Sequence, residues 1–145
     1  MWKFPCIKFK GQCHPLLATL DRLSAPLYLS TLIFKPTSIV SIVWQDASVL
    51  IWHVDSGALH KSHSLSGHTK AVTDLDWSPH EPQLLTASSD VKLWSTDCGQ
   101  CIRTYSYHLK GVQACCWLSH GKRFMSSGHN GIAIRDHDSS LLRAR

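Results

Sequence analysis

Cysteine pairs are the first candidates for chemistry in this 145-residue chain. Cys98 and Cys101 form a CxxC pair, a spacing that elsewhere binds zinc or cycles as a dithiol. Cys13 stands next to His14, and cysteine–histidine pairs can perform acyl transfer. No second CxxC follows at zinc-site spacing, and adjacent residues rarely reach the geometry of a nucleophile and its base. We therefore expect Gly99 to turn the chain between strands and Cys101 to fill a core position.

A histidine and an aspartate could also form a catalytic pair, and His68 and Asp90 are the candidates. Their positions recur forty residues later, where His108 and Asn130 stand. A repeated position is explained by architecture, so we predict a structural role. The sequence contains no phosphate-cradling glycine loop, paired carboxylates or His–Glu metal motif. We therefore predict no enzyme activity, no catalytic residue, no metal and no cofactor.

A repeat with a period near forty residues organises the chain. The segment 67–72, Gly-His-Thr-Lys-Ala-Val, recurs at 107–112 as Tyr-His-Leu-Lys-Gly-Val, and Trp77 recurs as Trp117. A constant period of this length indicates stacked supersecondary units, none of which buries its apolar face alone.

The elements within the repeat are short strands. The clearest repeat contains strand-like runs at 71–77, 83–88, 91–94 and 101–106, with a proline-rich turn at 78–82. No long stretch shows the 3.6-residue periodicity of an amphipathic helix. The pattern predicts an all-β chain in which four strands make one unit.

The residues Gly67, His68, Ser88, Asp90 and Trp94 resemble the histidine, hydroxyl, aspartate and tryptophan network of WD-repeat β-propellers. The resemblance implies a buried structural tetrad of His68, Ser88, Asp90 and Trp94, hydrogen-bonded between strands. It also implies four-stranded blades of ~40–45 residues, of which a closed ring has ~4–8. The chain would then be a partial propeller of about three blades that does not close the ring alone.

The repeat divides the chain into four segments. We predict a degenerate blade or a non-native leader at 1–38, a partial blade at 39–66, a blade at 67–106, and a degenerate blade with a tail at 107–145.

Two positions depart from the family pattern. The turn that follows Asp90 is two residues shorter than the corresponding turn at 46–49, which can shift the register of the hairpin. In the third repeat Arg135 stands at the tryptophan position, and either His129 or Asn130 stands at the aspartate position. The third blade therefore cannot form the full tetrad.

The order of motifs from 46 to 137 is similar to the WD-repeat subunit of GID/CTLH-type ubiquitin ligases. That resemblance implies a protein–protein interaction scaffold, a substrate-recruiting or assembly piece of such a ligase. Three alternatives stay open: a WD-repeat scaffold of another complex such as a pre-mRNA splicing complex, an RNA-binding module, and a truncated product without independent activity. The similar segments are Asp46–Trp52, His63–His68, Trp77–Thr86, Gly99–Tyr105, Gly111–Trp117 and Gly131–Ile132.

Partner contacts are predicted beside the repeated histidines. If other blades complete the propeller, Thr69, Lys70, Leu109 and Lys110 lie in loops at one face. We expect these residues to contact protein partners, and we also expect that self-association could complete the ring.

Charge and hydropathy bear on the class of partner and the compartment. The net charge is +5 and the pI about 9.0, but the basic residues are scattered and do not favour nucleic acid. No secretory signal and no apolar run of ~20 residues is visible, so no membrane association is predicted. Six unpatterned cysteines favour a reducing compartment, the cytoplasm or the nucleus.

Overall fold

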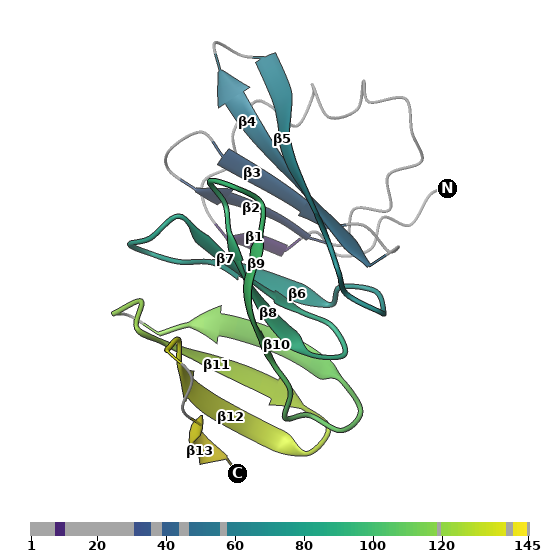
Figure 1. Cartoon of the computed structure of the whole chain (residues 1–145), viewed down its shortest axis with the longest axis vertical. Helices are drawn as coiled ribbons and strands as arrows, with labels where there is room; N and C mark the ends of the chain where they lie inside the picture. The colour runs from purple at the N-terminus through teal and green to yellow at the C-terminus, as the bar shows by residue number, and fades with distance from the viewer. Residues whose placement is uncertain are drawn as a thin grey trace.

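Thirteen strands and no helix make up the described part of the computed structural model, namely residues 8–10, 31–35, 39–43, 47–55, 58–118, 120–138 and 141–144. The strands form three sheets that follow one another along the long axis of the molecule (Figure 1). The prediction of an all-β, partial propeller is confirmed. Within the described residues, no helix could cross a membrane.

The first sheet draws on both N-terminal segments. Its order is β1-β2-β3-β4-β5, with β1 parallel to β2 and the other pairs antiparallel. Two of its strands come from segment 1–38, whose remaining residues, Cys13 and His14 included, lie outside the described part. The strands are β1 (Lys8–Lys10), β2 (Thr31–Lys35), β3 (Ile39–Val43), β4 (Ser48–Asp55) and β5 (Ala58–Ser66).

The second and third sheets are antiparallel and each follows chain order. The second contains β6 (Asp74–Trp77), β7 (Gln83–Ala87), β8 (Val91–Ser95) and β9 (Cys101–Tyr105). The third contains β10 (Val112–Trp117), β11 (Arg123–Gly128), β12 (Gly131–Asp136) and β13 (Leu141–Ala144). Strand β6 lies next to β2 of the first sheet and to β10 of the third sheet, so it connects the three sheets.

Each sheet has a register shift at the same place. The shift comes immediately before Trp52 in β4, before Trp94 in β8 and before Arg135 in β12. Leu84 pairs with Trp94 as Phe124 pairs with Arg135. A bulge that recurs at one position is a feature of the repeat, and it places Arg135 at the tryptophan position of the third sheet.

The short turn after β7 does not disturb the hairpin. Ala87 pairs with Val91, and the β7–β8 ladder runs without a register shift. Within the three-residue connection, the Ser88 amide donates to the Asp90 carbonyl at 2.9 Å. The register shift that the sequence suggested here is wrong, because a three-residue turn with its own hydrogen bond keeps the two strands in step.

The hydrophobic core lies between the sheets. One buried cluster joins the first and second sheets, and a second cluster joins the second and third. Each sheet thus buries its apolar side chains against the next, as stacked units require. The first cluster contains Val49, Ile51, Leu65, Val72, Leu75, Trp77, Leu84 and Trp94. The second contains Leu85, Ala87, Val91, Leu93, Tyr105, Val112, Cys115, Trp117 and Phe124.

Two carboxylates of β6 also hold the third sheet. Asp74 Oδ2 accepts the Cys115 amide at 3.1 Å, and Asp76 Oδ2 accepts the Trp117 amide at 2.8 Å. Asp74 is 7% exposed, so its charge has little access to water. Strand β10 is at the edge of its sheet and pairs with β11 on one side. The two carboxylates accept hydrogen bonds from its Cys115 and Trp117 amides.

Replacing Asp74 should therefore loosen the junction between the second and third sheets. We expect Asp74→Ala to lower the free energy of unfolding by roughly 1–3 kcal/mol, because the buried Cys115 amide loses its acceptor. Asp74→Asn should cost less, since the amide oxygen can still accept. Urea unfolding measures both, with the exposed Asp97→Ala as a control that should change little. Equal effects of the Asp74→Ala and Asp97→Ala changes would contradict this role.

Candidate functional site

Four hydrogen-bonded side chains cross the second sheet. His68 lies in the loop before β6, Thr86 in β7, Asp90 in the β7–β8 turn and Trp94 in β8. Trp94 Nε1 donates to Thr86 Oγ1 at 2.8 Å, and that oxygen lies 2.5 Å from His68 Nε2. On the other side of the ring, His68 Nδ1 lies 3.0 Å from Asp90 Oδ1. The loop before β6 is thereby tied to the hairpin of the same sheet.

The donors and acceptors give this network one direction. An indole N–H only donates, so the Thr86 hydroxyl hydrogen is left to donate to His68 Nε2, and His68 Nδ1–H donates to Asp90. Burial lowers the pKa of His68 below its ordinary value of 6.5, although the Asp90 carboxylate acts in the opposite direction. The imidazole is neutral at pH 7 and both of its nitrogens are occupied. It therefore has no free lone pair with which to act as a base.

Thr86 supplies the hydroxyl of this network, in place of the predicted Ser88. Strand β7 ends at Ala87, so Ser88 belongs to the turn, and the Trp94 indole donates to Thr86 within the strand. Ser88 Oγ instead donates to the Lys70 carbonyl at 2.8 Å. The structure thus brings together His68, Asp90 and Trp94 and gives Ser88 a separate task, which is to hold the backbone of the loop before β6.

The third sheet repeats part of the network. His108 Nε2 lies 3.0 Å from Ser126 Oγ, and His108 Nδ1 lies 2.8 Å from Asn130 Oδ1. Asn130, and not His129, therefore occupies the aspartate position. The Asn130 amide nitrogen also donates to the Tyr107 carbonyl at 3.3 Å. An uncharged side chain can thus accept the imidazole hydrogen and hold the loop before β10.

Arg135 replaces the tryptophan with a different contact. Its guanidinium carbon lies 5.8 Å from the Tyr105 ring centroid and 6.0 Å from that of Tyr107. Its Nη2 donates to the Ser106 carbonyl at 3.4 Å. The Arg135 guanidinium therefore packs against the ring of Tyr105, the last residue of β9, and against the ring of Tyr107, which follows β9.

The predicted partner residues lie together in the loops at one end of the sheets, which we call the loop edge. Thr69, Lys70, Leu109 and Lys110 are all exposed, and Leu109 is 91% exposed. Lys70 and Lys110 line a groove of about 200 Å³ between the second and third repeats. The groove is lined by Lys70, Ala71, Thr73, Ser88, Ser89, Lys110, Gly111, Val112, Gln113 and His129.

The CxxC pair lies at the β8–β9 turn, and both of its cysteines are exposed. Gly99 turns the chain as predicted, with φ of 68°. The prediction that Cys101 fills a core position is wrong, because the first four residues of the outer strand β9 face solvent. A hydrogen bond from the Ser95 side chain lowers the pKa of the Cys98 thiol. In the described part of the chain, no three His, Cys, Asp or Glu side chains could jointly hold a metal ion.

Comparison with known proteins gives the family of this fold. Residues 59–95 and 99–134 match the family described as WD domain, G-beta repeat, and together they cover half of the chain. The chain belongs to the WD40 repeat family. The first matched segment begins in β5 and the second begins just before β9, and each then runs into the third strand of the next sheet. This stagger links successive WD40 sheets covalently as well as by packing.

Named relatives of this WD40 chain are longer proteins. The WD repeat-containing protein WDS homolog of Arabidopsis thaliana is 30% identical over 107 residues, which cover 68% of this chain and 20% of that protein. The WD repeat-containing protein 26 homolog of Arabidopsis thaliana is 30% identical over 81 residues, or 54% of this chain and 14% of that protein. The U5 small nuclear ribonucleoprotein 40 kDa protein of Dictyostelium discoideum is 26% identical over 96 residues, or 65% and 27%. The chain thus spans between 14% and 27% of these relatives.

The two hydroxyl residues should differ in their effect on stability. Thr86→Val removes the oxygen that joins His68 to Trp94 and leaves two buried groups without a partner, so we expect a loss of roughly 2–3 kcal/mol. Ser88→Ala removes one hydrogen bond to a backbone carbonyl and should cost about 1 kcal/mol. Urea unfolding of both variants tests this. A larger loss of unfolding free energy for Ser88→Ala than for Thr86→Val would contradict the assignment of Thr86 as the hydroxyl of the network.

The neutral state of His68 should make stability pH-dependent. The unfolded chain protonates this ring near pH 6.5, whereas the folded chain resists until a lower pH. The contribution of His68 is therefore complete above pH 6.5, falls as the pH drops from 6.5 to the lower folded pKa, and is constant below that value. We expect the unfolding free energy to fall less steeply between pH 7 and 5 in His68→Gln than in the unchanged chain. Parallel slopes would contradict a buried neutral His68.

Proposed function

We propose that this WD40 chain is a protein-interaction scaffold that contacts its partners through Thr69, Lys70, Leu109 and Lys110. The observation that carries the proposal is the 91% exposure of Leu109 beside the groove at the loop edge. A large apolar side chain gains about 1.5–3 kcal/mol when a partner removes it from water. Leu109 is thus suited to anchor a partner, and the two lysines add charge around it.

The loops that carry these residues are held before a partner arrives. His68 and His108, the residues that precede Thr69 and Leu109, are buried and hydrogen-bonded. Ser88 Oγ fixes the Lys70 carbonyl. A partner therefore pays little ordering entropy when it binds this edge, which favours affinity.

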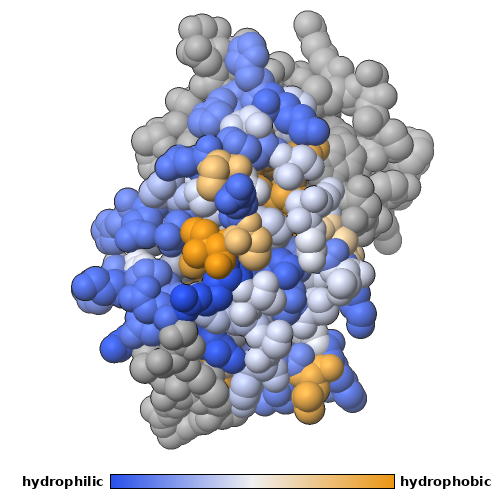
Figure 2. Space-filling model, viewed as in Figure 1, coloured by the Kyte–Doolittle hydropathy of each residue, from blue (hydrophilic) through white to orange (hydrophobic). Residues whose placement is uncertain are grey.

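Protein is favoured over nucleic acid as the partner. Binding of single strands needs aromatic side chains on which bases stack, in addition to positive charge. The groove at the loop edge offers Lys70 and Lys110 but no Phe, Tyr or Trp among its described lining residues. The face in Figure 2 is largely hydrophilic, with a few hydrophobic spots. A contact built around one apolar anchor and polar neighbours suits such a surface.

The complex that we propose is a ubiquitin ligase in the cytoplasm or nucleus, in which this chain recruits substrate or aids assembly. Its support is the order of motifs over residues 46–137, which resembles the WD-repeat subunit of GID/CTLH-type ligases. A second candidate is a pre-mRNA splicing complex. It is favoured by the similarity to a protein named U5 small nuclear ribonucleoprotein 40 kDa protein.

Affinity purification of the tagged chain, with mass spectrometry of its partners, should recover RING and CTLH-type ligase subunits. We expect Leu109→Asp to reduce this recovery about tenfold or more, because the anchor is lost. Ile102→Asp is the matched control, since Ile102 is also a large exposed apolar residue, 49% exposed on β9. Recovery of splicing proteins would favour the second candidate. Recovery of chaperones alone, or equal loss in both variants, would contradict the scaffold role.

Self-association is a separate part of the proposal. The third sheet leaves Ile132 46% exposed on β12, at the position that corresponds to the buried Val91 of the second sheet. A second copy that covers this position would bury it, as the third sheet buries Val91. Light scattering should then give a mass above that of one chain, and Ile132→Asp should return it to the monomer value. A monomer at all concentrations would exclude self-association.

A further inference from the structure

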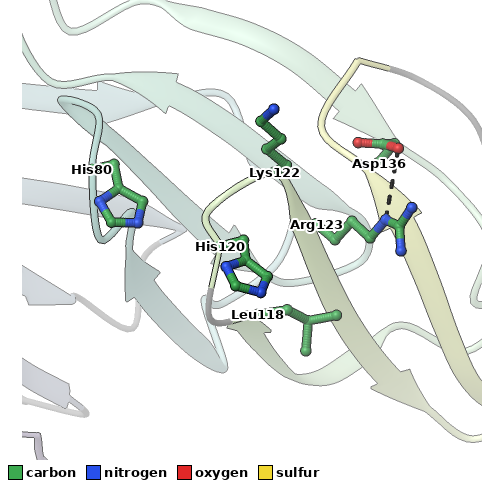
Figure 3. Close-up of a pocket in the computed structure, with 6 residues that line it drawn as sticks. All are labelled: His80, Leu118, His120, Lys122, Arg123 and Asp136. Atoms are coloured by element: carbon green, nitrogen blue, oxygen red, sulfur yellow. Dashed lines mark ion pairs between the residues drawn. The ribbon is translucent and has the colours of Figure 1, made fainter.

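A second cavity lies at the end of the sheets opposite to the loop edge. It follows β6 and β10, whereas the loop edge precedes these strands. Its volume is about 660 Å³, within the ~300–1,000 Å³ that is usual for ligand sites. Figure 3 shows the side chains that line it: His80, Leu118, His120, Lys122, Arg123 and Asp136.

The two histidines come from equivalent places in two repeats. His80 follows β6 and His120 follows β10, forty residues later. Gly121 adopts φ of 64° and lies against the other loop, where a Cβ would meet His80 Cδ2 at 3.0 Å and Pro79 Cγ at 3.2 Å. This close approach, for which a glycine is needed, keeps the two imidazole-bearing loops together.

The charge of the cavity is predominantly positive. Lys122 and Arg123 are cations, and Asp136 is the single carboxylate among the lining residues that the structure describes. The ion pair between Arg123 Nε and Asp136 Oδ2 is 3.8 Å long, and the Arg123 side chain remains 58% exposed. An exposed ion pair of this kind contributes little. Arg123 can therefore turn toward an anion without a large loss.

Backbone contacts fix the strand ends that carry these charges. Arg123 and Asp136 are opposite each other in the β11–β12 ladder. The His137 amide donates to the Lys122 carbonyl at 3.0 Å, and the Tyr105 hydroxyl donates to the His137 carbonyl at 2.5 Å. The basic residues thus stand on ordered backbone, as a binding site requires.

We propose that this cavity binds a phosphorylated serine or threonine on a segment of a protein partner. A phosphate carries close to two negative charges and three acceptor oxygens, which match a site of several nitrogen donors. Those donors are the Lys122 ammonium, the Arg123 guanidinium and the His80 and His120 rings. Among its described lining residues the cavity has no Phe, Tyr or Trp ring on which the bases of a nucleic acid could stack. The site is independent of the contacts proposed for the loop edge.

Fluorescence anisotropy with the full chain tests the proposal. The probe is a labelled ten-residue glycine-serine peptide with one phosphoserine, compared with its unphosphorylated form, a glutamate form and an oligouridine of equal length. We expect the phosphopeptide to bind tightest, and the double variant Lys122→Gln, Arg123→Gln to weaken its binding by about tenfold or more. Lys70→Gln with Lys110→Gln removes the same charge at the loop edge and should change it less than about twofold.

A second variant keeps the test decisive if the first one loses stability. His80 is exposed on the loop after β6 of the second sheet, and His80→Gln should also weaken phosphopeptide binding. Three results would overturn the proposal. The first is an equal loss of phosphopeptide affinity in the Lys122→Gln, Arg123→Gln variant and in the Lys70→Gln, Lys110→Gln variant. The others are phosphopeptide binding no tighter than that of the other peptides, and preferential binding of oligouridine. Because Lys70→Gln with Lys110→Gln leaves this site intact, failure here is distinct from failure of the loop-edge contacts.

Discussion

A buried imidazole is the constraint on which the rest of the structure depends. His68 uses both ring nitrogens, one toward Thr86 in the sheet and one toward Asp90 in a turn. Its position therefore couples the loop before a first strand to the hairpin of the same sheet. Because the ring is neutral, this coupling avoids the cost of a buried charge. Loops at the loop edge can then be exposed and still ordered, which is what recognition of a partner needs.

Coupling between sheets has a different physical basis. Hydrophobic packing in the two core clusters holds neighbouring sheets together without fixing a direction. The chain also links them covalently, because each matched repeat runs from one sheet into the next. Asp74 and Asp76 add direction, since each accepts one particular amide of β10. The corresponding positions of β10 itself are Ala114 and Cys116, neither of which has a carboxylate. The pair of carboxylates that accepts amides of the neighbouring sheet is therefore present in the second sheet and is not repeated in the third.

The period of the sequence was sufficient to predict the sheets but not all the contacts within them. Strand content and the repeat follow from the spacing of residues along the chain, and the family follows from the resemblance of His68, Asp90 and Trp94 to the WD-repeat network. The choice between Ser88 and Thr86 depended on where β7 ends, and element boundaries are weakly encoded. The exposure of Cys101 depended on its lying in an outer strand, which no pattern within one repeat reveals.

The third repeat separates what the geometry requires from what the sequence usually supplies. Asn130 replaces a carboxylate and still accepts the His108 hydrogen, because the ring needs an oxygen and not a charge. Gly128 stands where the second repeat has Ser88, and a Cβ there would lie 2.6 Å from His108 Nδ1. The imidazole thus occupies space that a side chain fills in the other sheet. Arg135, stacked on Tyr105 and Tyr107, then packs the tryptophan position without an indole. The third repeat therefore holds the loop before β10, which carries Leu109, although residues of the network differ in type from those of the second repeat.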